Sequence, residues 1–261
     1  MRVDLRAAWP SQGAILDPMK PSNRWKASLI VAVALALVAM PISLDGAGSA
    51  TPASWSQLPV TKDGSPYSLS PLANGAIEVH ASSYTGENER EFLWVNTAPT
   101  EANTTVCMQW SSGGLVDQEG AVLRLKVANG VFRAITVMRN IWGDKFYYIN
   151  FVSWNSESAV PFTILSGVNL AGYLTTSTSA IYPLNFCARA AGDTVEFIVW
   201  KQNDSKPHWG SILQGGAARI PPGYFGVGKE GVYIGHLIAP SSAVISNVTI
   251  DGRTFNPRLA A

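Results

Sequence analysis

The feature that most constrains the fold is a succession of short β-type runs separated by turn residues, with no useful stretch that repeats every 3.6 residues. In residues 121–127, Leu123 and Leu125 fall on one face and Arg124 and Lys126 on the other. Comparable runs occupy residues 75–82, 105–110, 131–138, 146–154, 162–166, 186–190, 194–200, 231–238 and 244–250. About ten strands without intervening helices predict one antiparallel all-β domain, built as a sandwich or a barrel.

Two segments sharpen this prediction. Asn129-Gly130 is a strong hairpin signal, because both residues tolerate positive φ. The simplest two-residue register sets Lys126 opposite Arg133, an unfavourable pair, so the hairpin is better predicted than its register. Residues 146–154 (FYYINFVSW) are apolar on both faces. This pattern indicates a central strand that is covered on both sides, or one whose outer aromatic side chains contact a ligand.

The N-terminal region has the pattern of an export signal. Residues 27–39 (ASLIVAVALALVA) follow three basic residues and precede small residues that end at Ala50. This order is typical of a signal peptide that is cleaved after Ala50. An uncleaved anchor helix is the alternative, since residues 27–44 are almost wholly apolar, and Met19 would make a more ordinary start. We expect a secreted or cell-envelope protein that contacts membrane only through an uncleaved leader.

The expected organisation has three parts. Residues 1–50 are an N-terminal extension and signal peptide, residues 51–70 are a linker or edge segment rich in Pro, Ser and Thr, and residues 71–261 form the β domain. Cys107 and Cys187 both lie in the exported part, which favours one disulfide. Two buried thiols are the alternative, because free cysteine packs as a small hydrophobic residue.

Composition and motifs exclude several classes of protein. The net charge is +1 and the chain has no basic block, which argues against nucleic-acid binding. The sequence contains no G-x-S-x-G motif, no P-loop and no dinucleotide fingerprint. Its three histidines are far apart, so we expect no zinc site.

The C-terminal half resembles a known fold family. Phe186–Arg189 and Gly192–Trp200 resemble a strand pair of concanavalin A-like lectins and glucanases, specifically LamG-type jelly rolls. Gly226–His236 and Asn247–Ile250 resemble the closing strands of that family. The resemblance extends over about Tyr67–Gly252 in strand order and implies a two-sheet antiparallel jelly-roll sandwich. Since the superfamily holds lectins, glycosidases, lyases and adhesion modules, it fixes no activity.

The same resemblance bears on cofactors. Calcium occurs in relatives of this fold, held by loop carboxylates and carbonyls. Asp117, Glu119 and Asp144 could serve here, but no local calcium pattern exists. We therefore expect no resident metal and no cofactor other than calcium.

Aromatic residues beside polar groups are the candidate ligand contacts. Sugars have apolar CH faces that pack on aromatic rings, while their hydroxyls bond to amides and carboxylates. Such groups adjoin in three segments, which supply the candidates Trp142, Asp144, Trp154, Asn155, His208 and Trp209. The alternative is that each tryptophan fills the core of the sandwich.

A carboxylate pattern supplies an alternative catalytic site. Glu87, Glu89 and Glu91 resemble the E-x-D-x-E motif of laminarinase-type glycosidases, with Glu89 in place of Asp. On a strand, carboxylates two residues apart share a face, which suits retaining hydrolysis. However, Asn88 and Arg90 stand where that strand's core-facing residues should be apolar. The alternative is a solvated acidic loop between two strands.

Three functions follow, in order of preference. The first is an exported, non-catalytic, lectin-like module that binds carbohydrate. The second is a retaining glycoside hydrolase or related polysaccharide enzyme that uses Glu87 and Glu91. The third is a structural or protein-interaction β-sandwich. The ligand and the oligomeric state are left open by the sequence.

Overall fold

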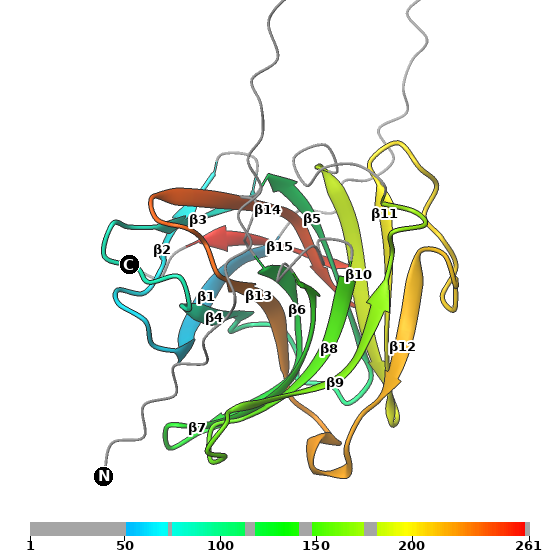
Figure 1. The fold of residues 1–261 in the computed structure, drawn as a ribbon, viewed down its shortest axis with the longest axis horizontal. Helices are drawn as coiled ribbons and strands as arrows, with labels where there is room; N and C mark the ends of the chain where they lie inside the picture. Colours follow the sequence, from blue (N-terminus) through cyan, green and yellow to red (C-terminus); the bar gives the residue numbers. More distant parts are fainter. Residues whose placement is uncertain (1–50, 73–74, 113–117, 141–147, 175–181, 259–261) are drawn as a thin grey trace, which may run out of the picture. The chain divides into compact units, whose positions relative to one another are not determined.

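The computed structural model describes residues 51–72, 75–112, 118–140, 148–174 and 182–258 (Figure 1). In these ranges the chain forms β-strands and a short 3-10 helix, η2 (Pro222–Tyr224), and no α-helix. The strands are β1 (Thr51–Thr61), β2 (Ser68–Pro71), β3 (Ile77–Ala81), β4 (Arg90–Val95), β5 (Thr104–Ser112), β6 (Gln118–Ala128), β7 (Val131–Asn140), β8 (Tyr148–Asn155), β9 (Phe162–Asn169), β10 (Leu184–Ala191), β11 (Thr194–Lys201), β12 (Gly215–Arg219), β13 (Lys229–Gly235), β14 (Ser241–Ile250) and β15 (Arg253–Arg258). The predicted signal or anchor helix lies outside the described residues.

The strands form two layers. The first layer has the order β1-β4-β13-β6-β7-β8-β9, and the second has β12-β11-β10-β5-β14, extended by β3 and β2. Large apolar side chains from both layers meet in the main core, where the rings of Phe151 and Phe197 lie 5.6 Å apart. β15 joins the layers, since it pairs with β14 antiparallel and with β1 parallel. The predicted all-β, two-sheet sandwich is confirmed.

Two strands, β1 and β2, begin the described part of the chain. β1 pairs with β15 over Thr51–Ser54 and with β4 over Trp55–Thr61. β2 pairs antiparallel with β3. Pro59 makes β1 difficult to recognise as a strand from the sequence, because proline lacks the N–H that a paired strand uses. The register of β1 against β4 shifts between Pro59 and Thr61, an irregularity that accommodates this residue.

The β6–β7 hairpin has the simple register in spite of its like charges. Asn129 and Gly130 both have positive φ (52° and 78°), as a two-residue turn requires. Lys126 then stands opposite Arg133. Each charge finds a partner elsewhere: the Arg133 guanidinium pairs with the Glu157 carboxylate at 2.8 Å, and Lys126 Nζ donates to the carbonyl oxygen of Phe225 at 2.8 Å. The predicted hairpin is confirmed.

The first layer is strongly curved. β4 and β9 are five strand spacings apart in it, about 24 Å for a flat sheet. Nevertheless, the Arg90 guanidinium carbon on β4 lies 5.6 Å from the ring centroid of Phe162 on β9. The face turned away from the main core is therefore concave. A second apolar cluster fills part of this face: Val60, Phe92, Val122, Leu125, Phe132, Ala134, Met138, Val152, Trp154 and Tyr233.

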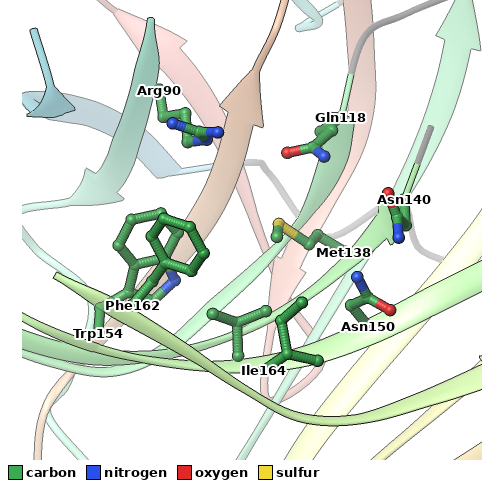
Figure 2. A pocket seen from close by; sticks show the side chains of 9 residues that line it. Arg90, Gln118, Met138, Asn140, Asn150, Trp154, Phe162 and Ile164 are labelled. Atoms are coloured by element: carbon green, nitrogen blue, oxygen red, sulfur yellow. The ribbon is translucent and has the colours of Figure 1, made fainter. Parts of the chain in front are cut away.

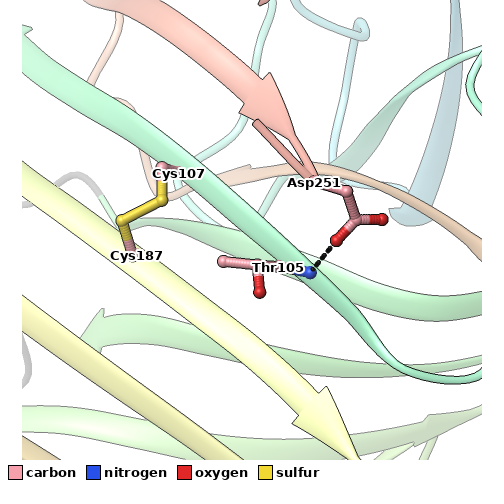
Figure 3. Close-up of a disulfide and its surroundings, with 4 residues drawn as sticks. All are labelled: Thr105, Cys107, Cys187 and Asp251. Atoms are coloured by element: carbon pink, nitrogen blue, oxygen red, sulfur yellow. Dashed lines mark hydrogen bonds between the residues drawn. A yellow bond between two sulfur atoms is a disulfide. The ribbon is translucent and has the colours of Figure 1, made fainter. Parts of the chain in front are cut away.

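The two cysteines form a disulfide across neighbouring strands (Figure 3). Cys107 on β5 and Cys187 on β10 stand directly opposite in register, with Cα atoms 4.0 Å apart. Their strand neighbours Met108 and Phe186 point into the main core, so the disulfide lies on the opposite face of the second layer. The predicted disulfide is thus present in the structure.

Candidate functional site

A pocket of about 310 Å³ opens on the concave face of the first layer (Figure 2). Its lining comes from the beginnings of β4, β6 and β9, the end of β7, and β8. The lining residues are Arg90, Gln118, Met138, Asn140, Asn150, Val152, Trp154, Phe162 and Ile164. This volume is at the lower end of the range of about 300–1,000 Å³ for small-molecule sites.

Trp154 forms a fixed part of the apolar wall. Its indole Nε1 donates to Thr136 Oγ1 at 2.8 Å, and its ring meets Phe92 edge-on at 5.5 Å. Phe162 lies over it, with ring centroids 5.5 Å apart. Because only 1% of Trp154 is exposed, it packs in the second apolar cluster and supports Phe162. Phe162, which is half-buried, offers the more accessible aromatic surface.

Three amide side chains form the polar part of the lining. Gln118 is fixed, since its Oε1 accepts a hydrogen bond from the Tyr233 hydroxyl at 3.0 Å. Asn140 stands at the end of β7, opposite Tyr148 in register. Asn150 lies two residues further along β8, and no side-chain hydrogen bond connects it to another described residue. The amides therefore place hydrogen-bonding groups beside an aromatic wall.

Arg90 supplies the positive charge of the lining. Its Nη1 donates to Thr61 Oγ1 and to the carbonyl oxygen of Asn88, both at 3.3 Å. Its charge opposes the rise in the pKa of Tyr233 that burial causes. Burial, together with the nearby Arg90 charge, lowers the pKa of His236 to about 4. His236 is consequently neutral near pH 7, which leaves Arg90 as the local charge.

The structure separates the three glutamates of the alternative catalytic site. Glu87 is exposed in the turn before β4, whereas Glu89 and Glu91 are almost completely buried (1% and 0% exposed). Glu89 Oε2 accepts the backbone N–H of Asp63 at 2.6 Å. Glu91 Oε1 accepts the backbone N–H of Tyr67 at 2.7 Å. None of the three glutamates lines the pocket.

Burial determines how these carboxyls ionise. It raises the pKa of Glu91 to about 7, against the effect of the hydrogen bonds from Tyr67 and Gln57. It also raises the pKa of Glu89, which the Asp63 N–H opposes. Both side chains connect β4 to the segment between β1 and β2. Through these hydrogen bonds the two carboxyls support the segment.

The other sequence candidates lie apart from the pocket. Asn155 follows Trp154 at the end of β8 and accepts the backbone N–H of Glu157 at 3.1 Å. His208 and Trp209 belong to the loop after β11, where the Trp209 ring lies 4.3 Å from the guanidinium carbon of Arg189. His208 and Trp209 therefore lie beside the second layer, whereas Trp154 lies on the concave face of the first layer.

Two candidates, Trp142 and Asp144, lie outside the described residues, as does Asp117. Glu119 is buried, and its Oε2 accepts a hydrogen bond from the Tyr182 hydroxyl at 2.8 Å. Within the described ranges, no group of three or more His, Cys, Asp or Glu side chains could hold a metal ion. None of the helical segments described there is long and apolar enough to cross a membrane.

Sequence reasoning missed most of the pocket. Arg90, Gln118, Asn150 and Phe162 come from four different strands, and only the curvature of the layer brings them together. One signal was available: Arg90 and Phe92 alternate with Glu91 along β4. The catalytic motif would need an apolar, core-facing residue at position 90. Arg90 is charged because it faces the pocket and not the main core.

Comparisons with known proteins find no sequence match and only distant structural similarity. No protein-family model matches the sequence, and neither does any curated protein. Among solved structures, the chain is similar to the carbohydrate-binding module CBM66 of Bacillus subtilis, with 11% identity, a TM-score of 0.47, and coverage of 78% of this chain and 98% of that one. A Bacillus subtilis protein of unknown function with a galectin-like fold is 11% identical, with a TM-score of 0.49 and coverage of 77% of this chain and 90% of that one. A Bacillus licheniformis β-glucanase is 10% identical, with a TM-score of 0.44 and coverage of 79% of this chain and 92% of that one.

These scores are all below 0.5, so the similarities carry no conclusion about the site or its ligand. The concanavalin A-like resemblance concerns the fold, and the two-sheet jelly roll that it implies is the one that the strand pairing shows.

Proposed function

We propose that this chain is an exported, non-catalytic carbohydrate-binding module whose concave-face pocket holds one sugar unit. The observation that supports the proposal is the lining itself, where Gln118, Asn140 and Asn150 stand beside the exposed side of Phe162. Amides suit hydroxyl groups, and an aromatic surface suits the CH face of a sugar ring. Export rests on the signal-like leader, and Trp142 and Asp144 stay predicted contacts.

The pocket favours binding over hydrolysis. Retaining glycosidases need two carboxyls about 5–5.5 Å apart on either side of the bond that they cleave. No carboxylate is among the described residues that line this pocket. Glu89 and Glu91 are engaged instead with the backbone N–H groups of Asp63 and Tyr67.

A glycan-binding experiment tests the proposal. The purified full-length chain is applied to a broad glycan array, and each positive glycan is measured by titration calorimetry. Asn150→Ala and Phe162→Ala should each weaken binding about fivefold or more, since each removes a contact with the sugar. Gln109→Ala is the matched control, because Gln109 bonds to Asn185 on the second layer, away from the pocket.

The results separate the three functions. Binding that depends on Asn150 and Phe162, without released products, supports the proposal. Failure to bind any glycan, with or without calcium, overturns it in favour of a structural domain. Hydrolysis that Glu87→Gln or Glu91→Gln abolishes would favour the glycosidase.

A further inference from the structure

Arg90 is the only charged side chain among the described residues that line the concave-face pocket. It is half-buried, and none of the ion pairs between described residues involves it. A charge that is partly removed from water is usually compensated by a partner of opposite sign. The protein supplies two neutral oxygens instead, at the long distance of 3.3 Å.

The carboxylates nearest in sequence form no ion pair with Arg90, although its charge opposes the rise in the pKa of Glu89 that burial causes. Glu91 follows Arg90 on β4, so its side chain lies on the other face of the strand, whereas Glu89 immediately precedes β4. They accept the backbone N–H groups of Asp63 and Tyr67. The remaining titratable neighbours are Tyr233 and His236, and both are neutral at pH 7 because burial disfavours their charged forms.

The position of Arg90 also suits a ligand. It comes from β4, on the side of the pocket opposite β8 and β9, and its guanidinium lies 5.6 Å from the Phe162 ring centroid (Figure 2). A guanidinium has five N–H donors arranged as a fork that matches a carboxylate or a sulfate. The hydrogen bonds to Thr61 and Asn88 both use Nη1 and leave the other N–H groups of this fork for an anion.

We propose that the sugar bound in this pocket is acidic, and that its carboxylate or sulfate group pairs with Arg90. This inference rests on the proposed function and names its ligand class. The ring of the sugar packs on Phe162, and its hydroxyls bond to the amides of Asn140 and Asn150. The anionic group then gives Arg90 the partner that the described residues do not supply.

The test compares ligands that differ only in charge. The full-length chain is titrated with oligogalacturonate and with its methyl ester, and with a sulfated galactan and its desulfated counterpart. The charged member of at least one pair should bind about 10- to 100-fold more tightly, the usual range for a charge-assisted hydrogen-bonded pair. This preference should fall as salt is raised. The pair that responds identifies the anionic group as carboxylate or sulfate.

Variants assign the effect to Arg90. Arg90→Gln should remove the preference for the charged ligand, so that the charged and neutral members of the responding pair bind this variant with the same affinity. Arg90→Lys should keep part of the preference, because it retains the charge without the fork. Arg219→Gln is the control, since Arg219 is exposed on β12 of the second layer and pairs with Asp193. Circular dichroism and thermal unfolding verify that each variant is folded.

Each outcome has one meaning. Equal binding of charged and neutral members, or a preference that survives Arg90→Gln, overturns the acidic-sugar inference and leaves carbohydrate binding intact. Failure to bind any glycan overturns the proposed function, and the inference with it.

Discussion

Replacing Glu91 by Gln should remove part of the pH dependence of stability and make the protein more stable above pH 7. Glu91 is fully buried and accepts hydrogen bonds from the Tyr67 backbone and the Gln57 side chain. Burial raises its folded-state pKa to about 7, whereas an unperturbed glutamate has a value of 4.5. The folded protein therefore holds a proton on Glu91 in a pH range where the unfolded chain has released it.

The sign follows from this proton difference. Between about pH 4.5 and 7 the folded state binds more protons than the unfolded state, so the free energy of unfolding falls as pH rises. The contribution of Glu91 is fully present below pH 4.5 and is lost as pH passes through 7. A difference from 4.5 to about 7 corresponds to about 3 kcal/mol, at about 1.4 kcal/mol per pH unit. Burial raises the pKa of Glu230 to about 8, so this residue also makes the free energy of unfolding fall as pH rises.

Urea unfolding, followed by tryptophan fluorescence at intervals from pH 5 to pH 9, measures this contribution. The wild-type protein should lose stability across the range, and Glu91→Gln should lose about 3 kcal/mol less. Glu87→Gln is the matched control, because Glu87 is an exposed carboxyl in the preceding turn. A wild-type stability that is constant or increases from pH 5 to 8 would refute the reasoning. So would a Glu91→Gln variant with the wild-type slope.

Two further predictions concern the stability of the fold. The Cys107–Cys187 disulfide closes a loop with a sequence separation of 80, so the Cys107→Ala/Cys187→Ala double variant should lose about 4.5 kcal/mol in urea unfolding. Reduction of the wild-type protein should give a similar loss, and a loss below about 1 kcal/mol in both cases would contradict it. Thr136→Val leaves the buried Trp154 Nε1 without its acceptor, and should therefore cost about 1–3 kcal/mol in the same assay. An unchanged unfolding midpoint would show that Trp154 finds another partner.

Local pattern was sufficient for the strands that have a clear period or a strong turn. The β6–β7 hairpin followed from Asn129-Gly130, and β8 followed from a run that is apolar on both faces. The missed strands lack these signals. β12 (Gly215–Arg219, GGAAR) has little apolar surface, and the prolines of β1 resemble a linker. These two are strands because neighbouring strands pair with them, which is a tertiary effect that overrides weak local propensity.

The candidate site was harder to predict because it depends on curvature. Trp154 was singled out as a ligand contact, and it does line the pocket, but its ring is covered by Phe162 from the next strand. Arg90 and Phe162 lie 72 residues apart in the sequence and five strand spacings apart in the first layer, and they come together only because this layer curls. Sequence identifies the kinds of side chain that bind sugars, whereas the curl of the layer decides which of them share a space.

The segment around Arg90 shows how the choice of which strand face is concave changes the chemistry that a sequence suggests. Side chains alternate between the faces of a strand, so either the glutamates or Arg90 and Phe92 can face the concave side, but not both. With Glu89 and Glu91 on that face, β4 would offer paired carboxylates, as a hydrolase requires. Phe92 packs instead with Trp154 and Tyr233 in the second apolar cluster, which fixes the opposite choice. The packing of one aromatic ring therefore places a guanidinium where the motif suggested carboxylates, and this favours recognition of an anion over hydrolysis.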